Sequence, residues 1–228
     1  MSLTLYKRKR SFEETPEPQG KKKSSGRSLK FVIQKHDASH LHYDFRLEME
    51  GVLKSWAIPK GPSLNPDDKR LAMMVEDHPY DYRTFEGTIP EGNYGAGTVM
   101  VWDEGSYEAL GHEKEPVKNQ EKVLLQELEK GDLKIVLHGK KVKGAYALVK
   151  IKGRGENAWL LIKKKDDEVS KSDITKKDRS VKTNRNLRQI AEETGGNVKE
   201  KKSLVKKTPK AQLLNTKGTR KVKKKSTT

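Results

Sequence analysis

The sequence has 228 residues, of which 32% are hydrophobic and 36% charged, and its net charge is +17. It contains no cysteine, which excludes disulfides and thiolate zinc sites and favours the cytosol. The charge is uneven: residues 1–30 carry +6 and residues 163–228 carry +14, whereas residues 31–162 carry −3. These values predict a near-neutral folded body between two basic arms, which favour a polyanionic partner, most often nucleic acid.

The N-terminal segment predicts an arm. Pro16 and Pro18 interrupt any long helix, and residues 21–26, Lys-Lys-Lys-Ser-Ser-Gly, are typical of a linker. The chain is charged from Lys7 onwards and has no apolar region of the kind found in signal peptides. It also lacks the roughly 20 consecutive apolar residues of a membrane span. We expect a cytoplasmic protein without membrane contact, in which residues 1–28 form a basic, partly ordered arm.

The next segment, residues 41–49, alternates without a break between apolar and polar side chains. A period of two predicts a half-buried strand. Such a strand would present His42, Asp44 and Arg46 on its outer face, each about 7 Å from the next. Imidazole and carboxylate groups are metal ligands, and guanidinium groups bind phosphate. The alternative interpretation is a solvated strand face.

Two further histidines lie just before this strand. A turn at Asp37–Ser39 would fold His36 back beside His42 and Asp44, so that two imidazoles and one carboxylate face a divalent ion with open positions. His40 lies on the same face. The chemistry of the residues alone therefore leaves His36 and His40 as alternatives for the third ligand.

The remaining turn signals divide residues 29–163 into short strands and one helix. Gly51 predicts a hairpin that joins the central strand to the next. Pro116 suits the first turn of a helix that Gly131 ends. Roughly eight strands at this spacing favour a barrel or a sandwich. The expected strands are 29–34, 41–49, 52–58, 70–76, 98–102, 106–109, 133–137, 144–151 and 159–163, with a short extended segment at 84–89, a hairpin turn at 103–105 and a helix at 116–130.

Several other features have a structural interpretation. The glycine-rich loop at residues 91–97 lacks the Gly-Lys-Ser/Thr ending of a phosphate-binding loop. The three tryptophans fall in expected strands and are predicted to lie in the core. After Lys163 the strand pattern ends, and residues 164–228 are predicted to form a disordered lysine-rich tail, with a weak helix at 185–193. The tail has two interpretations, a solubilising or degenerate extension and a non-specific nucleic-acid tether.

Six sequence blocks occur in an order that closely resembles the 3′-phosphoesterase domain of bacterial DNA ligase D and its stand-alone bacterial and archaeal relatives. The blocks are Phe31-Val-Ile-Gln-Lys-His36, Leu41-His-Tyr-Asp-Phe-Arg46, Leu53-Lys-Ser-Trp-Ala-Ile-Pro-Lys-Gly-Pro62, Val75-Glu-Asp-His-Pro79, Phe85-Glu-Gly-Thr-Ile-Pro90 and Tyr94-Gly-Ala-Gly97. The resemblance covers about residues 5–163. The sequence holds no ligase or polymerase domain, so we expect a free-standing form.

This resemblance implies a compact closed β-barrel of about eight strands over residues 29–163, with short flanking helices. It implies a manganese-dependent hydrolase, with other divalent ions as alternatives. The enzyme would remove a 3′-terminal ribonucleoside and then the 3′-phosphate, leaving a 3′-OH. The implied partners are DNA or RNA–DNA 3′ ends and a separate DNA ligase or other end-joining proteins, and the implied state is a monomer.

The resemblance also assigns residues. It chooses His36 over His40, so the implied metal ligands are His36, His42 and Asp44. The implied phosphate-contacting and catalytic residues are Arg46, His78, Tyr82, Lys60 and Arg70, and the implied substrate-binding residues also include Gln34, Arg10 and Glu17. Arg10 and Glu17 match positions that serve the ribonucleoside-removing step. Ser11 stands where the family often has Asp, which predicts a weaker first step than second step.

Two other classes of function fit part of the pattern. One is a non-catalytic nucleic-acid-binding barrel that uses its basic arms. The other is a cupin-like iron(II) oxygenase, since two histidines and a carboxylate also bind iron. Arg46 beside Asp44, together with Lys60 and Arg70, favours phosphate chemistry because anion-binding groups around a metal suit phosphate better than oxygen.

Overall fold

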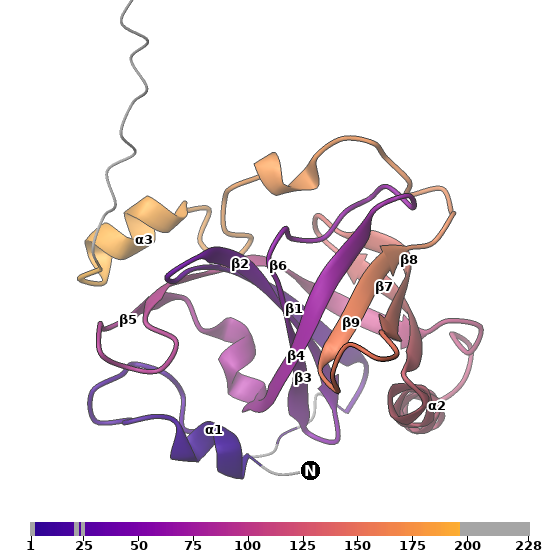
Figure 1. Ribbon diagram of the computed structural model, residues 1–228, viewed down its shortest axis with the longest axis horizontal. Coiled ribbons are helices and arrows are strands. Elements are labelled where there is room, and N and C mark those ends of the chain that lie inside the picture. Colours follow the sequence, from indigo (N-terminus) through magenta and orange to yellow (C-terminus); the bar gives the residue numbers. More distant parts are fainter. Residues whose placement is uncertain (1–2, 21–22, 24–25, 197–228) are drawn as a thin grey trace, which may run out of the picture. The chain divides into compact units, whose positions relative to one another are not determined.

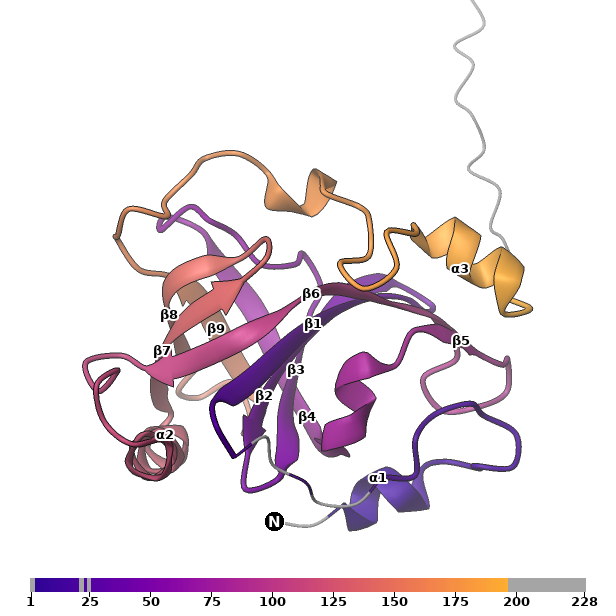
Figure 2. The ribbon, with the colours of Figure 1, turned by 180° about the vertical axis from the view of Figure 1, so that it is seen from behind.

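A computed structural model of the protein describes residues 3–20, 23 and 26–196 (Figures 1 and 2). Eight antiparallel strands pair in the order β1-β2-β3-β4-β9-β8-β7-β6, and pairing of β1 with β6 closes them into a barrel. The short strand β5 pairs with the start of β6. The expectation of a closed barrel of about eight strands is thus confirmed.

The strands are β1 Leu29–Asp37, β2 Leu41–Met49, β3 Val52–Ile58, β4 Lys69–Pro79, β5 Gly87–Ile89, β6 Gly97–Ala109, β7 Asp132–Gly139, β8 Lys143–Lys150 and β9 Ala158–Lys163. The helices are α1 Thr4–Arg8, α2 Val117–Lys130 and α3 Leu187–Glu193, with 3₁₀ turns η1 Tyr80–Thr84 and η2 Ile174–Lys176. The predicted helix is confirmed as α2, which follows Pro116 and ends at Gly131 with φ 77°. None of the helices in the described ranges has the length and apolar character needed to cross a membrane.

The predicted hairpin at residues 98–109 is wrong, because β6 runs through it as one strand. The Asp-Glu-Gly sequence at residues 103–105 does not form a turn, and its residues let β7 approach β6 closely. A Cβ on Gly105 would lie 2.1 Å from the His138 carbonyl oxygen, so only glycine fits there. The Asp103 carboxylate accepts hydrogen bonds from the backbone N–H groups of residues 140, 141 and 142. These residues therefore tie β6 to the β7–β8 turn.

The barrel interior is filled by large apolar side chains, and the three tryptophans lie there as predicted. Trp56 and Trp102 are fully buried and Trp159 is 2% exposed. Trp56 and Trp159 meet edge to face at 6.0 Å between ring centroids. The interior is a packed core, so any ligand site must lie at the outer wall.

A second apolar cluster covers the outer wall of β2 and β3. Its members are Tyr6, Leu53, Tyr80, Tyr82, Phe85, Ile89 and Val99, with Phe12 packed against them. Leu53 and Val99 belong to β3 and β6. The others come from α1, η1, β5 and their neighbours, which lie together on the side of the barrel away from α2 (Figures 1 and 2). Asp44 and Arg46 are consequently only 7% and 2% exposed. The prediction of a half-buried strand is wrong, because from Tyr43 onwards the residues on both faces of β2 are buried.

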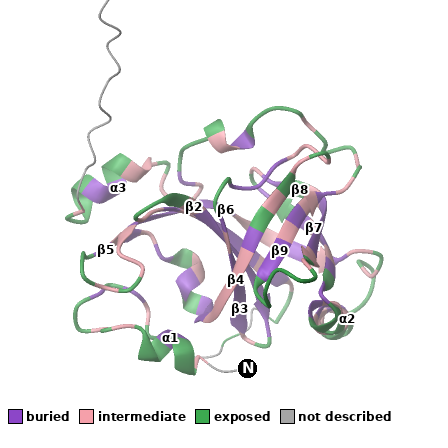
Figure 3. Ribbon diagram, in the orientation of Figure 1, coloured by how far each residue is buried: buried purple, intermediate pink, exposed green. Residues whose placement is uncertain are grey.

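Residues 164–196, which we call the C-terminal strap, pack on the barrel and differ from the predicted tail. Ile174 and Ile190 are 3% and 0% exposed and join the main core, as the buried patches on η2 and α3 show (Figure 3). The Trp102 Nε1–H donates to the Lys177 carbonyl at 2.5 Å. The domain therefore extends past Lys163, and the weak helix expected at 185–193 is α3. Residues 197–228 lie outside the described residues.

The strap is also held by one buried carboxylate. Glu86 accepts hydrogen bonds from Ser180 Oγ at 2.6 Å, from the Thr183 hydroxyl and from the Val101 backbone N–H at 3.0 Å, and it pairs with Arg185 at 3.2 Å. Its side chain is 1% exposed. Polar contacts of this kind leave no hydrophobic periodicity in the sequence, which explains why the strap was not predicted.

These contacts predict that the strap stabilises the barrel. Truncation after Lys163 removes Ile174 and Ile190, and each buried side chain is worth about 1.5–3 kcal/mol. We expect the free energy of unfolding, measured with urea, to fall by about 3 kcal/mol or more. Truncation after Gly196 removes none of the described contacts and is the matched control. Equal stability of the two truncated proteins would contradict the role assigned to the strap.

Candidate active site

The β1–β2 hairpin places the predicted metal ligands together. The two strands pair so that His36 lies opposite His42 and Gln34 lies opposite Asp44. The centroids of the two imidazole rings are 4.8 Å apart. The short turn that the sequence predicted after His36 produces this register. His40 is exposed, and its side chain is not part of the group.

The residues His36, His42 and Asp44 fit a divalent ion. Their ligand atoms all lie within 4.8 Å of one another. The His42 Nδ1–H donates to the His40 carbonyl at 2.9 Å, which leaves Nε2 with a lone pair 3.6 Å from Asp44 Oδ1. Nε2 of His36 is buried and has no hydrogen-bond partner in the described part of the chain. Such an unsatisfied buried atom is costly unless a ligand completes it.

Arg46 is held rigidly beside Asp44. Its Nε donates to Gln34 Oε1 at 2.8 Å, Nη1 to Ser55 Oγ at 2.9 Å and Nη2 to Asp44 Oδ2 at 2.8 Å. Burial alone would raise the pKa of Asp44, but the Arg46 guanidinium and then His36 lower it, and the pKa of Asp44 lies well below its usual range. Gln34 is fixed in turn by donating to the carbonyls of Tyr82 and Phe85.

A bulge in β4 brings His78 to the same wall. Leu53 pairs with His78 and Ser55 with Val75, so two steps on β3 oppose three on β4. The His78 Nδ1–H donates to the Glu76 carbonyl at 2.9 Å, and Nε2 then accepts from Arg10 Nη2 at 3.2 Å. Burial, followed by the charges of Arg46 and Arg10, holds the pKa of His78 well below its usual range. His78 is therefore a neutral ring near pH 7.

The N-terminal arm reaches this wall through Arg10 and Glu17. The Glu17 Oε1 accepts from Arg10 Nε at 2.8 Å and from the Tyr82 hydroxyl at 3.0 Å. Arg10 also pairs with Glu76 at 3.2 Å. Burial and the nearby charge of Glu17 raise the pKa of Tyr82 well above its usual range, so its hydroxyl stays a donor. Ser11 is exposed, and its carbonyl accepts from Glu14 in the turn after α1.

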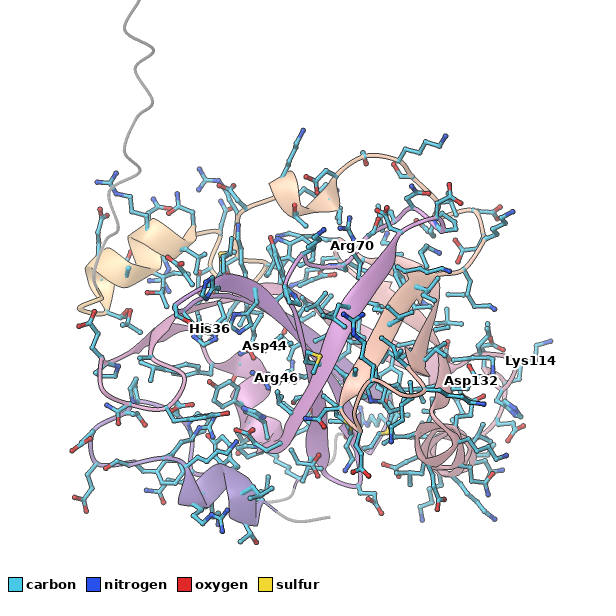
Figure 4. The ribbon with its side chains drawn as sticks, in the orientation of Figure 1. His36, Asp44, Arg46, Arg70, Lys114 and Asp132 are labelled. Carbon is cyan, nitrogen blue, oxygen red and sulfur yellow. The ribbon has the colours of Figure 1, made fainter. Side chains whose placement is uncertain are left out.

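These groups surround one cavity of about 200 Å³. Its lining residues are Arg10, His36, Ala38, His42, Asp44, Arg46, Ala57, Val75, Glu76, His78, Tyr82, Ile89, Tyr94 and Gly95. The structure thus brings the three proposed metal ligands together with Arg46, His78 and Tyr82, as the row of His36, Asp44 and Arg46 shows (Figure 4). Gln34 and Glu17 lie behind the lining and hold Arg46 and Arg10 in place.

Lys60 and Arg70 are not in this cavity. Lys60 is exposed in the turn that follows β3. Arg70 lies near the start of β4, eight residues before His78, or roughly 25 Å along an extended strand. Its Nη2 donates to Asp68 at 2.9 Å, and Figure 4 shows it apart from His36, Asp44 and Arg46. The structure therefore gives neither residue a contact with a phosphate that is bound at Arg46.

Ser55 and Glu76 belong to the site but were not predicted from the sequence. Ser55 lies opposite Arg46 in the β2–β3 register and accepts its Nη1–H. Glu76 holds both Lys9 and Arg10. Ser55 lies between Leu53 and Ala57 in a strand with the expected period of two, so its place opposite Arg46 could have been inferred from the hairpin. Glu76 could not, because the bulge changes the period of β4.

Comparisons with known proteins agree with this geometry. The sequence profile of the DNA ligase D 3′-phosphoesterase domain matches residues 34–150. This protein belongs to that family. It is 51% identical over 174 residues to the multifunctional non-homologous end joining protein LigD of Pseudomonas aeruginosa, covering 75% of this chain and 19% of that protein. It is 43% identical over 167 residues to LigD of Mycolicibacterium smegmatis, covering 73% and 21% of the two chains.

A third relative is the multifunctional non-homologous end joining DNA repair protein LigD of Mycobacterium tuberculosis, 42% identical over 172 residues, covering 75% and 21%. The chain thus spans about a fifth of the length of these relatives. The family match includes all three candidate metal ligands with Arg46, His78 and Tyr82. The N-terminal arm and the C-terminal strap lie outside it, although Arg10 lines the cavity.

The buried neutral state of His78 makes stability depend on pH. In the unfolded chain His78 takes up a proton near its ordinary pKa of 6.5, whereas the folded chain resists it. The unfolded state therefore binds more protons below about pH 6.5, and the contribution of His78 falls by at most about 1.4 kcal/mol per pH unit as the pH decreases. We expect His78→Gln to show a shallower loss of unfolding free energy between pH 7 and 5, measured with urea and a chelator. Parallel curves for the two proteins would contradict a buried neutral His78.

Proposed function

We propose that this protein is a metal-dependent 3′-phosphoesterase of nucleic-acid ends. It would remove a 3′-terminal ribonucleoside and then the 3′-phosphate, leaving a 3′-OH. The observation that carries this proposal is one cavity in which two imidazoles and a carboxylate face the guanidinium groups of Arg46 and Arg10. Metal ligands beside buried arginines suit a phosphate ester better than a neutral substrate. Family membership supports the same activity.

The proposed metal ligands are His36, His42 and Asp44. A divalent ion bound there would supply positive charge that polarises a phosphoryl oxygen. The carbonyl of His40 orients the His42 ring, as hydrogen-bond partners of metal-bound histidines commonly do. Resemblance to the family favours Mn²⁺, and other divalent ions stay alternatives.

Arg46 is suited to bind the phosphate. A guanidinium has five N–H donors, and Gln34, Ser55 and Asp44 use one each on Nε, Nη1 and Nη2. One N–H on each Nη remains for an anion. Because the three bonds already fix the side chain, little reorganisation is needed when negative charge develops on the phosphate.

The hydrogen bonds of His78 restrict what its ring can do in the free protein. In the hydrogen-bond arrangement described above, its one N–H is committed to the Glu76 carbonyl, so the free enzyme offers no proton to a leaving oxygen from this ring. We propose that His78 first positions Arg10, through the bond from Nη2. An anionic phosphate in the cavity would favour the charged imidazolium, so any proton donation would follow substrate binding.

The ribonucleoside-removing step is assigned to the arm. Glu17 joins Arg10 to Tyr82, so this part of the cavity exists only when the arm is docked. DNA or RNA–DNA 3′ ends are the proposed substrates, and a separate DNA ligase or other end-joining protein is the proposed consumer of the 3′-OH. The monomeric state, the cytoplasmic location and the free-standing form stay predictions from the sequence.

The first prediction from this proposal concerns the metal ligands. His42→Ala should abolish Mn²⁺-dependent phosphatase and diesterase activity. It should also weaken Mn²⁺ binding, measured by calorimetry. Loss of a residue that only hydrogen-bonds a metal ligand weakens metal binding by roughly 10- to 100-fold, and we expect loss of the ligand itself to have a larger effect. His40→Ala is the matched control, because it keeps the carbonyl that orients His42. A folded His42→Ala protein with normal Mn²⁺ affinity and turnover would refute the assignment.

The second prediction concerns the balance of the two steps. Ser11 is exposed beside Arg10 and stands where the family often has an acidic residue. We expect 3′-phosphate removal to be faster than ribonucleoside removal, and Ser11→Asp to increase only the latter, by several-fold. Both rates can be followed on one labelled primer with a 3′-terminal ribonucleotide. Equal rates that the substitution does not change would rule out this division.

A further inference from the structure

The ring of Tyr94 is exposed at the edge of the cavity, and the proposed chemistry does not use it. The large apolar side chains that are exposed in the described residues are Leu5, Leu41, Leu71, Tyr94 and Val169. Tyr94 is the one aromatic ring among them and is 48% exposed. It also lines the cavity that holds Arg46 and His78. An exposed aromatic ring in this position is available to a bound substrate.

The glycine-rich loop holds this ring in place. The Asn93 N–H donates to the Pro90 carbonyl at 3.3 Å and the Ala96 N–H to the Asn93 carbonyl at 3.1 Å, which gives two consecutive turns. Gly92 and Gly95 have φ values of 88° and 77°, which other residues rarely adopt. The loop, predicted to be structural, is therefore a compact support for one aromatic side chain.

Cations from the arm surround the ring. Lys9 Nζ donates to the Tyr94 hydroxyl at 3.1 Å and lies 4.5 Å from the ring centroid, and Arg10 Cζ lies 5.5 Å from it. Lys9 and Arg10 also pair with Glu76, at 3.1 and 3.2 Å. The ring is thus held by its hydroxyl and lies against two basic side chains, although Glu76 balances part of their charge. An aromatic ring beside basic side chains suits a single nucleic-acid strand.

The volume of the cavity decides which part of a nucleotide meets Tyr94. About 200 Å³ is below the roughly 300–1,000 Å³ of pockets that enclose a whole drug-sized ligand. With the phosphate at Arg46, a cavity of this volume has room for the phosphate and part of the sugar. The base of the same nucleotide then lies at the rim, where Tyr94 is exposed.

We infer that Tyr94 is a stacking platform for the terminal nucleobase of the strand whose 3′ end enters the cavity. This inference rests on the proposed function. Stacking on an aromatic ring is tolerant of sequence, because every base has a π-face. The platform would therefore favour ends that carry a base over ends that do not, without selecting among the four bases.

The kinetic test compares two single-stranded 3′-phosphate substrates, one with a terminal base and one with an abasic terminal nucleotide. Wild-type kcat/KM should favour the base-bearing end by about 5- to 150-fold, the range for one stacked base. Tyr94→Leu should bring this ratio close to one. Tyr94→Phe keeps the ring but loses the bond to Lys9, and it should keep the preference for the base-bearing end. Leu71→Ala changes an exposed apolar residue outside the cavity and should keep this preference as well. A wild-type ratio near one, or an unchanged ratio in Tyr94→Leu, would overturn the inference.

A binding test separates this inference from the proposed activity. A strand with a terminal 3′-phosphorylated 2-aminopurine is titrated with the chelator-treated full-length protein, and stacking quenches its fluorescence. Quenching by the wild type and by Tyr94→Phe, together with loss of quenching in Tyr94→Leu, would support the platform. If the same wild-type protein turns over no substrate, only the phosphoesterase proposal fails. Equal quenching by Tyr94→Leu, or no quenching by the wild type, would overturn the platform whatever the turnover.

Discussion

The buried ion pair between Arg46 and Asp44 is the interaction on which the rest of the site depends. The two side chains lie 2.8 Å apart and are 3% and 9% exposed. Removing two charges from water costs several kcal/mol per ion, and the attraction compensates only when the remaining polar atoms are also satisfied. Gln34 and Ser55 supply those bonds from the neighbouring strands, because the register places Gln34 opposite Asp44 and Ser55 opposite Arg46. The register of the barrel strands therefore offsets the free-energy cost of burying these two charges.

Burial of this pair requires a cover that the barrel itself does not provide. The interior is occupied by the tryptophan core, so the polar residues of β2 lie on the outer wall. The cluster built around Tyr6 and Tyr82 covers that wall and lowers the local dielectric, which strengthens each interaction beneath it. The same cover keeps His78 neutral beside two arginines. Local electrostatics at the site thus depend on α1 and η1 as much as on the strands.

The sequence predicted the parts of the site that follow from local period and turns. Alternation along β2 placed His42, Asp44 and Arg46 on one face, and the short turn returned His36 to that face. The cover was not predictable, because Tyr6 and Tyr82 are distant in sequence and carry no pattern that pairs them. The resemblance named Arg10 and Glu17, yet only the structure shows that they contact His78 and Tyr82.

Irregular strands account for most of the remaining differences between the structure and the predictions from the sequence. The bulge in β4 contains neither glycine nor proline, so no signal marked it, yet it turns His78 toward Ser55. The turn residues Asp103–Gly105 suggested a hairpin but serve the close approach of β6 and β7. Arg70 matched a functional position by motif, while the length of β4 places it far from His78. Two candidate functional residues on one strand need not belong to the same site when they lie near its opposite ends.

The two ends of the described chain act on the cavity in different ways, although both lie outside the family match. The arm contributes Arg10 to the lining and Glu17 behind it. The strap contributes no lining residue, but Thr194 meets Thr88 of β5 at 2.8 Å, and Glu86 joins the strap to β6. Because β5 carries Ile89 and leads into the loop of Tyr94, the strap supports the wall from which that ring projects. The arm therefore shapes the site directly, and the strap shapes it through the strands it holds.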